Sequence, residues 1–183
     1  MTTATQTKGQ NNSGATLQTV APEPPRIEFG QVKPEAYRGL LELDRYARAA
    51  GLDASLIELV KLRASLINGC AYCVDMHTKD ARAAGESEQR LYAVPVWRET
   101  PFYTARERAA LSWTEAVTDI KGTGVPDAAY AEVKAQFDEQ EIVALTMAVI
   151  AINGWNRFAI SMRSRVGSYS PPANKNAGVG RTA

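Results

Sequence analysis

The fold is decided by the segment "DASLIELVKLRASLINGCAYCVDMHTKDARAAG", residues 53–85. Asp53 is a favourable helix N-cap, Asn68 and Gly69 together form a helix stop signal, and a second stop signal follows at Gly85. The apolar side chains before the first stop recur at helical spacing. The segment therefore predicts two helices that are joined by a tight turn and form a hairpin.

The second helix, predicted from about Cys70 to Ala84, carries both cysteines of the chain, Cys70 and Cys73, and its only histidine, His77. Their i, i+3, i+7 spacing places the three side chains on one stripe of the helix. Cys70 lies at the helix start, where free backbone N–H groups and the helix dipole favour an anion and lower the pKa of a thiol. Tyr72, between the cysteines, is interpreted as a partly buried side chain and a candidate for substrate binding.

Glu58 lies in an apolar stretch of the first helix, at a distance from the turn that matches the distance of His77. At about 1.5 Å rise per residue, Glu58 lies roughly 15 Å up one helix and His77 roughly 12 Å up the other. A carboxylate in such a position is a candidate for partial burial and proton handling. We therefore predict that Glu58 orients His77, which delivers a proton to a leaving group.

A lowered thiol pKa alone does not make this cluster an efficient catalyst. Lowering the pKa from about 8.5 to about 6.5 raises the thiolate fraction at pH 7 about 25-fold, whereas the nucleophilicity of the thiolate falls about 8-fold. The net gain is about threefold, and proton delivery contributes about 10²–10⁴-fold. The second cysteine then resolves a sulfenic acid as a disulfide.

Other functions fit the same residues. Cys70, Cys73, His77 and Glu58 are four acceptable zinc ligands, although structural zinc sites usually take their ligands from two separated pairs. The cysteines also fit an inert core position, because free cysteine is among the most buried residue types. A redox-sensing protein without enzymatic activity would use the same cluster. Thiol redox catalysis is favoured because a C-x-x-C pair in a reducing cytosol is usually redox-active or metal-binding.

The rest of the sequence predicts an all-α domain, residues 28–166, between two tails. Residues 1–27 and 167–183 are poor in large apolar side chains and are predicted to be disordered and flexible, respectively. Thr104 and Glu107 form a predicted capping box, and Gly154 is a predicted kink. The further helices are expected within residues 34–51, 87–102, 104–122, 126–137 and 138–165.

Charge and composition exclude several classes of protein. The 183 residues include 21 Lys and Arg against 20 Asp and Glu, a formal charge of +1, which argues against nucleic-acid binding by phosphate neutralisation. No run of about 18 apolar residues predicts a membrane span, and the first twenty residues do not resemble a secretory signal. The sequence therefore predicts a cytoplasmic protein with neither membrane nor nucleic acid as a partner.

The last helix is apolar over more of its circumference than one core face needs. Ile142, Leu145, Val149 and Ile152 fill one stripe, and a second group extends it beyond about 100°; this group comprises Val143, Met147, Ile150 and Trp155. Some 140 ordered residues do not make a large domain, so we expect this helix to be shared with other subunits of a symmetric homo-oligomer.

The sequence from Glu58 to Thr118, "ELVKLRASLINGCAYCVDMHTKDARAAGESEQRLYAVPVWRETPFYTARERAALSWTEAVT", strongly resembles the AhpD-like alkylhydroperoxidase family of the carboxymuconolactone decarboxylase superfamily. The motif is a Glu followed twelve residues later by C-x-x-C and four residues after that by His. The similarity extends from about Tyr37 to the "INGWNRFAISMR" segment. AhpD itself has a His directly before the second Cys, where this chain has Tyr72. The decarboxylase branch generally lacks the C-x-x-C pair, which disfavours decarboxylation.

This resemblance implies an AhpD-like helical bundle that assembles as trimers or hexamers. It implies a thiol-dependent peroxidase that reduces organic hydroperoxides and hydrogen peroxide, with Cys73 as the peroxidatic and Cys70 as the resolving cysteine. Glu58 and His77 would form the proton relay. A Cys70–Cys73 disulfide would be the redox centre, with no metal or other cofactor, and an unidentified thiol or dithiol would supply the electrons.

Overall fold

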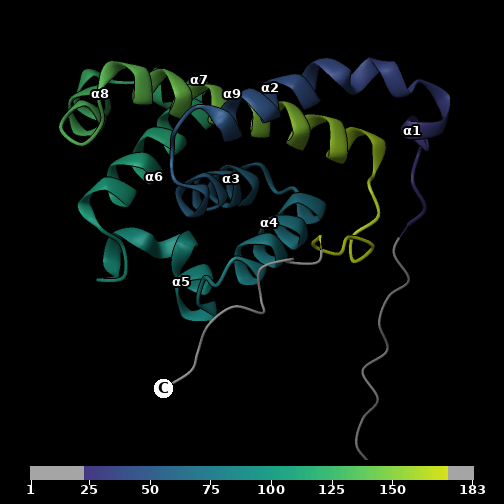
Figure 1. The fold of residues 1–183 in the computed structure, drawn as a ribbon, viewed down its shortest axis with the longest axis horizontal. Coiled ribbons are helices and arrows are strands. Elements are labelled where there is room, and N and C mark those ends of the chain that lie inside the picture. The colour runs from purple at the N-terminus through teal and green to yellow at the C-terminus, as the bar shows by residue number, and fades with distance from the viewer. Residues whose placement is uncertain (1–22, 173–183) are drawn as a thin grey trace, which may run out of the picture.

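The predicted hairpin is present in the computed structural model, which describes residues 23–172 (Figure 1). Helix α3 (Ala54–Asn68) ends at Gly69, whose φ of 70° lies in the left-handed region that favours glycine. Helix α4 (Ala71–Ala83) begins directly after Cys70. The described residues contain helices and turns and no strand, so the predicted all-α class is confirmed.

Most of the other helices lie within the predicted segments, but the short helix Phe29–Val32 was not predicted and the segment 104–122 is divided into two helices. Two of them begin with a capping box, one at the predicted Thr104 and Glu107 and one at Asp138 and Glu141. Pro95 lies in a 3₁₀ helix, as expected for a segment interrupted by proline. The bounds are α1 (Phe29–Val32), η1 (Pro34–Tyr37), α2 (Arg38–Ala49), α5 (Glu88–Ala93), η2 (Val94–Glu99), α6 (Ala105–Thr118), α7 (Ile120–Thr123), α8 (Asp127–Lys134) and α9 (Glu139–Met162).

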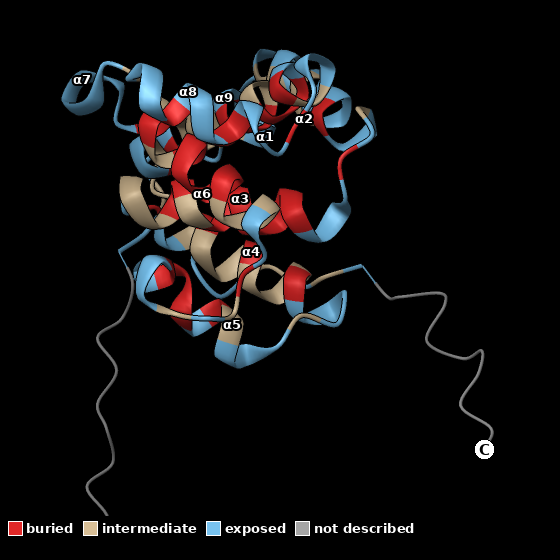
Figure 2. Ribbon diagram, turned by 90° about the vertical axis from the view of Figure 1, so that its left-hand side faces the viewer, coloured by how far each residue is buried: buried red, intermediate tan, exposed pale blue. Residues whose placement is uncertain are grey.

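Helix α3 is the centre of the bundle and packs against α4, α6 and α9, while α2 lies beside α9 (Figure 1). Figure 2 shows that buried residues concentrate on α3 and the inner faces of its neighbours. The close approach of α2 and α9 depends on Gly154, where an added Cβ would lie 2.8 Å from Leu40 Cδ2. Helix α9 is assigned as one uninterrupted helix through this glycine, so Gly154 admits a neighbouring side chain instead of breaking the helix.

Helix α9 is long and apolar enough to cross a membrane by length and composition, but half of its most apolar window is buried within the chain. Ile142, Leu145, Val149 and Ile152 are buried, as the stripe predicts. Val143 and Ile150, on the predicted second stripe, are 56% and 46% exposed. The helix therefore belongs to the core of the bundle and also presents apolar side chains on its outer face.

Buried amides fix α9 to the hairpin turn. Asn156 is fully buried and donates a hydrogen bond from Nδ2 to Ser65 Oγ (3.0 Å). Asn68, the last residue of α3, donates to Asn156 Oδ1 (2.9 Å) and to Asn153 Oδ1 (3.0 Å). Because buried polar groups are costly when unpaired, these bonds favour one position of the turn that precedes Cys70.

Most of the two predicted tails, residues 1–22 and 173–183, lies outside the described residues. In the described part, the Arg26 backbone N–H donates to the Met162 carbonyl (3.0 Å). The Gly167 N–H donates to Asp75 Oδ2 on α4 (3.1 Å). Short parts of both predicted tails therefore contact the helical domain.

Candidate functional site

The two cysteines lie at the turn between α3 and α4, and both are only 1% exposed. Cys70 is the N-cap of α4 and accepts a hydrogen bond from the Cys73 N–H at 3.4 Å. Cys70 and Cys73 are joined in a disulfide, with their Cα atoms 5.3 Å apart. The C-x-x-C helix thus brings the two sulfur atoms into bonding contact, as the sequence predicts.

Glu58 and His77 face each other across the hairpin. His77 Nδ1 and Glu58 Oε2 are 2.7 Å apart, and both side chains are buried. An ionised carboxylate only accepts hydrogen bonds, so the proton of this bond lies on Nδ1. His77 Nε2 has no hydrogen-bond partner among the described residues. Glu58 therefore orients the imidazole ring and leaves its second nitrogen available.

A cationic side chain holds the other oxygen of Glu58. Arg48 Nη1 on α2 donates to Glu58 Oε1 at 2.7 Å, and Arg48 also pairs with Asp44 (2.9 Å). Burial alone raises the pKa of Glu58, but the hydrogen bond from His77 and the charges of His77 and Arg48 outweigh burial. The pKa of Glu58 falls from 4.5 to about 2. Glu58 is thus an ionised carboxylate at neutral pH.

Lys61 completes this ionic network one turn after Glu58. Its side chain is 1% exposed and pairs with Asp44. Burial lowers the pKa of Lys61, as does the charge of Arg48, while Asp44 opposes both effects. The network thus places two cations and two carboxylates between α2 and α3, next to the histidine.

A cavity of about 470 Å³ opens beside the disulfide. Of the two cysteines, Cys73 lines it, together with His77 and the ionic side chains Asp44, Arg48 and Asp80. Tyr72, the predicted substrate contact, also lines it. Besides Glu28 and Arg165, the other large side chains in the wall are apolar or aromatic: Ile27, Phe29, Leu41, Met76, Trp155, Phe158 and Tyr169. The cavity therefore offers a largely apolar space whose wall includes Cys73 and His77.

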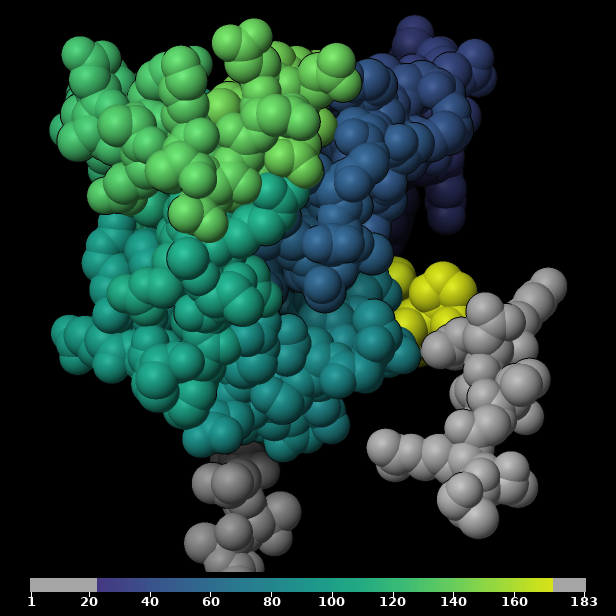
Figure 3. Space-filling view, turned by 60° about the vertical axis from the view of Figure 1, so that its left-hand side comes forward, coloured from purple at the N-terminus to yellow at the C-terminus, as the bar shows by residue number. Residues whose placement is uncertain are grey.

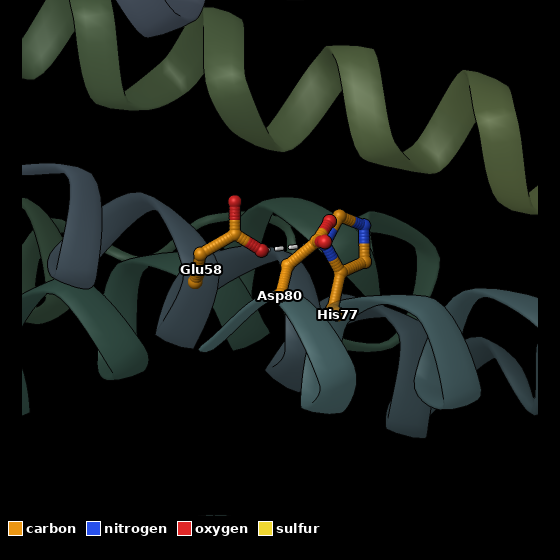
Figure 4. Close-up of side chains that lie close together, drawn as sticks. All are labelled: Glu58, His77 and Asp80. Atoms are coloured by element: carbon orange, nitrogen blue, oxygen red, sulfur yellow. Dashed lines mark hydrogen bonds and ion pairs between the residues drawn. The ribbon is translucent and has the colours of Figure 1, made fainter. Parts of the chain in front are cut away.

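The residues that lie close enough together to share a metal ion are not the four that the zinc alternative used, because Asp80 takes the place of the two cysteines. Glu58, His77 and Asp80 have ligand atoms within 4.8 Å of one another, and Figure 4 shows both carboxylates beside the imidazole ring. The carboxylates already accept hydrogen bonds, Glu58 from Arg48 and His77, and Asp80 from the Tyr169 hydroxyl (2.6 Å). A cation at this position would have to compete with those donors.

Sequence reasoning identified the residues of the hairpin but missed those that reach it from elsewhere. The sequence contained one signal of the ionic network: Lys61 is a charged residue in the middle of an apolar helix, three residues after Glu58. Asp44 and Arg48 share one face of α2 at i, i+4 spacing, which is also common on solvated helices. Asp80 also lines the cavity, although its place in the sequence does not distinguish it from a residue on a solvated helix face.

The pKa of Glu58 predicts a specific loss of stability in acid. A carboxyl group whose pKa is lower in the folded than in the unfolded chain stabilises the fold above the unfolded pKa, and this contribution disappears as the pH falls through the folded pKa. The difference between 4.5 and about 2 corresponds to roughly 3 kcal/mol at neutral pH. We expect Glu58→Gln to destabilise the protein at pH 7 and to have little effect near pH 2.

Urea unfolding at fixed protein concentration between pH 7 and pH 2 measures this effect. The difference in unfolding free energy between wild type and Glu58→Gln should narrow by roughly 3 kcal/mol below pH 4.5. Glu99→Gln, at an exposed position at the end of η2, is the matched control. A Glu58→Gln difference that stays constant with pH would contradict the assignment of the ionised group.

Comparison with known proteins gives a consistent family assignment for this architecture. The model of the carboxymuconolactone decarboxylase family matches residues 34–116. The uncharacterized protein YdfG of Bacillus subtilis is 39% identical over 143 residues, which cover 78% of this chain and 97% of that protein.

Two solved structures are also similar. One, from Agrobacterium tumefaciens, is a protein of unknown function with a suggested identity as the antioxidant defence protein AhpD. It is 48% identical, has a TM-score of 0.76, and the match covers 78% of this chain and 98% of that chain. The other is the alkylhydroperoxidase AhpD core of an uncharacterized peroxidase-related protein from Ralstonia eutropha. It is 20% identical with a TM-score of 0.65, and the match covers 76% of this chain and 74% of that one, which shows a shared fold.

Proposed function

Because the chain belongs to the carboxymuconolactone decarboxylase family and has an AhpD-like fold, we propose that it is a thiol-dependent peroxidase for organic hydroperoxides and, less efficiently, hydrogen peroxide. The observation that carries the proposal is the position of Cys73 in the cavity wall together with His77, whose Nδ1 is held by Glu58. A nucleophile and an oriented proton donor are the two groups that peroxide reduction needs.

In the proposed first step, the Cys73 thiol gives its proton to His77 Nε2, which produces a thiolate and an imidazolium ring, and the thiolate attacks the terminal oxygen of a hydroperoxide, ROOH. The S–O bond forms, the O–O bond breaks, and the leaving alkoxide takes a proton from His77 Nε2 to give ROH. Sulfur is oxidised to the sulfenic acid, and the peroxide is reduced by two electrons. Glu58 supports this step because its carboxylate stabilises the imidazolium ring, which carries a proton on Nδ1 as well as the transferable proton on Nε2.

In the second step, the Cys70 thiol attacks the Cys73 sulfenic acid. The S–S bond forms and water leaves, which gives the Cys70–Cys73 disulfide. A dithiol reductant then returns two electrons and two protons by thiol–disulfide exchange. We propose that this exchange takes place in the cytoplasm, where dithiol reductants are maintained in the reduced state.

The proposal is tested by thiol titration of the fully reduced protein before and after one equivalent of cumene hydroperoxide. We expect two titratable thiols before the addition and none afterwards. Mass spectrometry should show a monomer lighter by two hydrogen atoms, together with one equivalent of cumyl alcohol. One bound zinc ion per chain in protein purified under reducing conditions, with both thiols protected from peroxide, would overturn the peroxidase proposal.

We further propose that the protein is a homo-oligomer, a trimer or a hexamer, in which the outer face of α9 is covered by a neighbouring subunit. The exposed Val143 and Ile150 support this proposal, because exposed apolar groups along a central helix gain from burial. We expect an interface of more than about 2,000 Å² per subunit pair, in the obligate range.

Light scattering at micromolar concentration tests the assembly. We expect a multiple of the 19.9 kDa chain mass for the wild type and a shift toward monomer for Val143→Glu combined with Ile150→Glu. Tyr92→Glu is a matched control on α5, where the side chain is 74% exposed. A wild-type protein with monomer mass and full peroxidase activity would contradict the proposed assembly.

A further inference from the structure

Two segments outside the helical hairpin form the outer side of the cavity beside Cys73. Residues 164–172 follow α9 and are drawn in yellow in Figure 1 and Figure 3. Residues 25–29 lie before and at the start of α1. An ion pair of 2.8 Å between Arg165 and Glu28 joins the two segments. The outer wall of the cavity is therefore built from parts of the chain that are far apart in sequence.

The C-terminal segment is held on α4, the helix that carries Cys73 and His77, by three hydrogen bonds. The Gly167 N–H donates to Asp75 Oδ2 (3.1 Å), and Lys79 Nζ donates to the Tyr169 carbonyl (3.0 Å). The Tyr169 hydroxyl donates to Asp80 Oδ1 (2.6 Å). Asp75 and Lys79 also pair with each other (2.9 Å). Three successive contacts along one helix fix the path of the segment, which we call the C-terminal strap (residues 164–172).

Tyr169 is the residue of the strap with the largest side chain in the cavity wall. Its hydroxyl donates a hydrogen bond to Asp80. A carboxylate oxygen of Asp80 lies within 4.8 Å of a ring nitrogen of His77. Burial and the negative charge of Asp80 raise the pKa of Tyr169 well above its ordinary value, so the hydroxyl stays protonated and donating at neutral pH. The aromatic ring is thereby held at the same end of the cavity as the imidazole.

The size and lining of the cavity indicate what this ring contacts. A volume of about 470 Å³ lies within the range of roughly 300–1,000 Å³ that is typical of sites for small organic ligands. Hydrogen peroxide fills only a small part of such a space. Trp155, Phe158 and Tyr72 contribute further aromatic surface. A hydroperoxide that carries an aromatic or branched apolar group would bury that group against these rings while its O–O bond approaches Cys73.

We propose that Tyr169 is a specificity-determining residue, and that its ring, held by the C-terminal strap, selects hydroperoxides with bulky apolar groups over hydrogen peroxide. This inference rests on the proposed peroxidase function for its substrate class. The ring contributes apolar contact, and the hydroxyl positions the ring through Asp80. Removal of the ring therefore weakens binding of the apolar group and leaves the chemistry at Cys73 in place.

The test uses alkylation of Cys73, which does not depend on peroxidase turnover. In the Cys70→Ser protein, Cys73 is the only thiol of the full chain. Its rates with N-phenylmaleimide and N-methylmaleimide are measured and divided by the rates of free N-acetylcysteine. We expect the phenyl-to-methyl ratio to exceed one, and Tyr169→Ala to lower it about threefold to tenfold, as the loss of one aromatic contact implies.

Two further variants define the role of the ring. Tyr169→Phe retains the ring and two of the three strap contacts, so its ratio should stay within about twofold of the parent. Tyr130→Ala removes an exposed tyrosine from α8, outside this cavity, and should leave the ratio unchanged. Thermal unfolding confirms that each variant is folded. An unchanged ratio in folded Tyr169→Ala, or an equal loss in Tyr169→Phe, would overturn the assignment of the ring.

Peroxide turnover then separates this inference from the proposed function. With both cysteines present, Tyr169→Ala should lower kcat/KM for cumene hydroperoxide about threefold to tenfold relative to hydrogen peroxide. If turnover is present but this preference is unchanged, Tyr169 does not determine specificity and the peroxidase proposal stands. If the alkylation ratio changes but neither peroxide is consumed, the peroxidase proposal fails and the position of the Tyr169 ring in the cavity is supported.

Discussion

Replacement of Cys73 by serine is expected to abolish peroxide turnover, with a loss of at least about a thousandfold in kcat/KM, because the hydroxyl group cannot replace a thiolate as the nucleophile. Serine is close in size to cysteine and preserves the start of α4, so the fold should be retained. The measurement is peroxide consumption with dithiothreitol as the electron donor.

The companion variant Cys70→Ser separates the two roles of the cysteine pair. Cys73 should still be oxidised in a single turnover, and the sulfenic acid should be trapped by dimedone because the resolving thiol is missing. Ser161→Ala, at an exposed position on α9, is the control for an unrelated side chain. Rapid oxidation of Cys73→Ser together with slow oxidation of Cys70→Ser would mean that Cys70 is the attacking residue.

The second large effect is expected for His77→Gln. Proton delivery to a leaving group contributes about 10²–10⁴-fold, so the rate of cumene hydroperoxide reduction should fall by a factor in this range. Glu58→Gln should cause a smaller loss, because Glu58 orients the imidazole and does not itself reach the leaving oxygen. Pre-steady-state oxidation of reduced protein measures the step directly.

The dependence on the leaving group distinguishes proton delivery from a merely structural role of His77. A peracid releases a carboxylate, which leaves without a proton, whereas an alkyl hydroperoxide releases a strongly basic alkoxide. His77→Gln should therefore slow reaction with an alkyl hydroperoxide far more than reaction with peracetic acid. Equal losses for both substrates would show that the variant disturbs the site in general, and would contradict the assigned role.

The hairpin could be predicted from sequence because its determinants are local. Gly69 provides the left-handed turn, and the constant rise of the α-helix places Glu58 and His77 at similar heights on either side of it. The Thr104–Glu107 capping box likewise depends on residues three positions apart. Such features follow from spacing alone.

The remainder of the site depends on packing between distant segments. Arg48 reaches Glu58 only because the end of α2 approaches α3, and Tyr169 reaches Asp80 across 89 positions of sequence. Hydrophobic periodicity identifies which face of a helix is buried but does not specify which other helix that face contacts. An ion pair on a solvated helix and a pair of charged residues beside a cavity therefore have the same local sequence pattern. Tyr169 also belongs to a segment whose composition predicted a flexible tail.

Helix α9 connects the turn beside the cysteine pair with the exposed apolar face that the proposed assembly would cover. Asn156 holds the turn before Cys70, while Val143 and Ile150 lie exposed on the same helix. A continuous α-helix transmits an axial displacement along its length with little loss, because stretching it breaks its backbone hydrogen bonds. A neighbouring subunit that shifted α9 would therefore also shift Asn156, so the proposed assembly would couple subunit contacts mechanically to the reactivity of the cysteine pair.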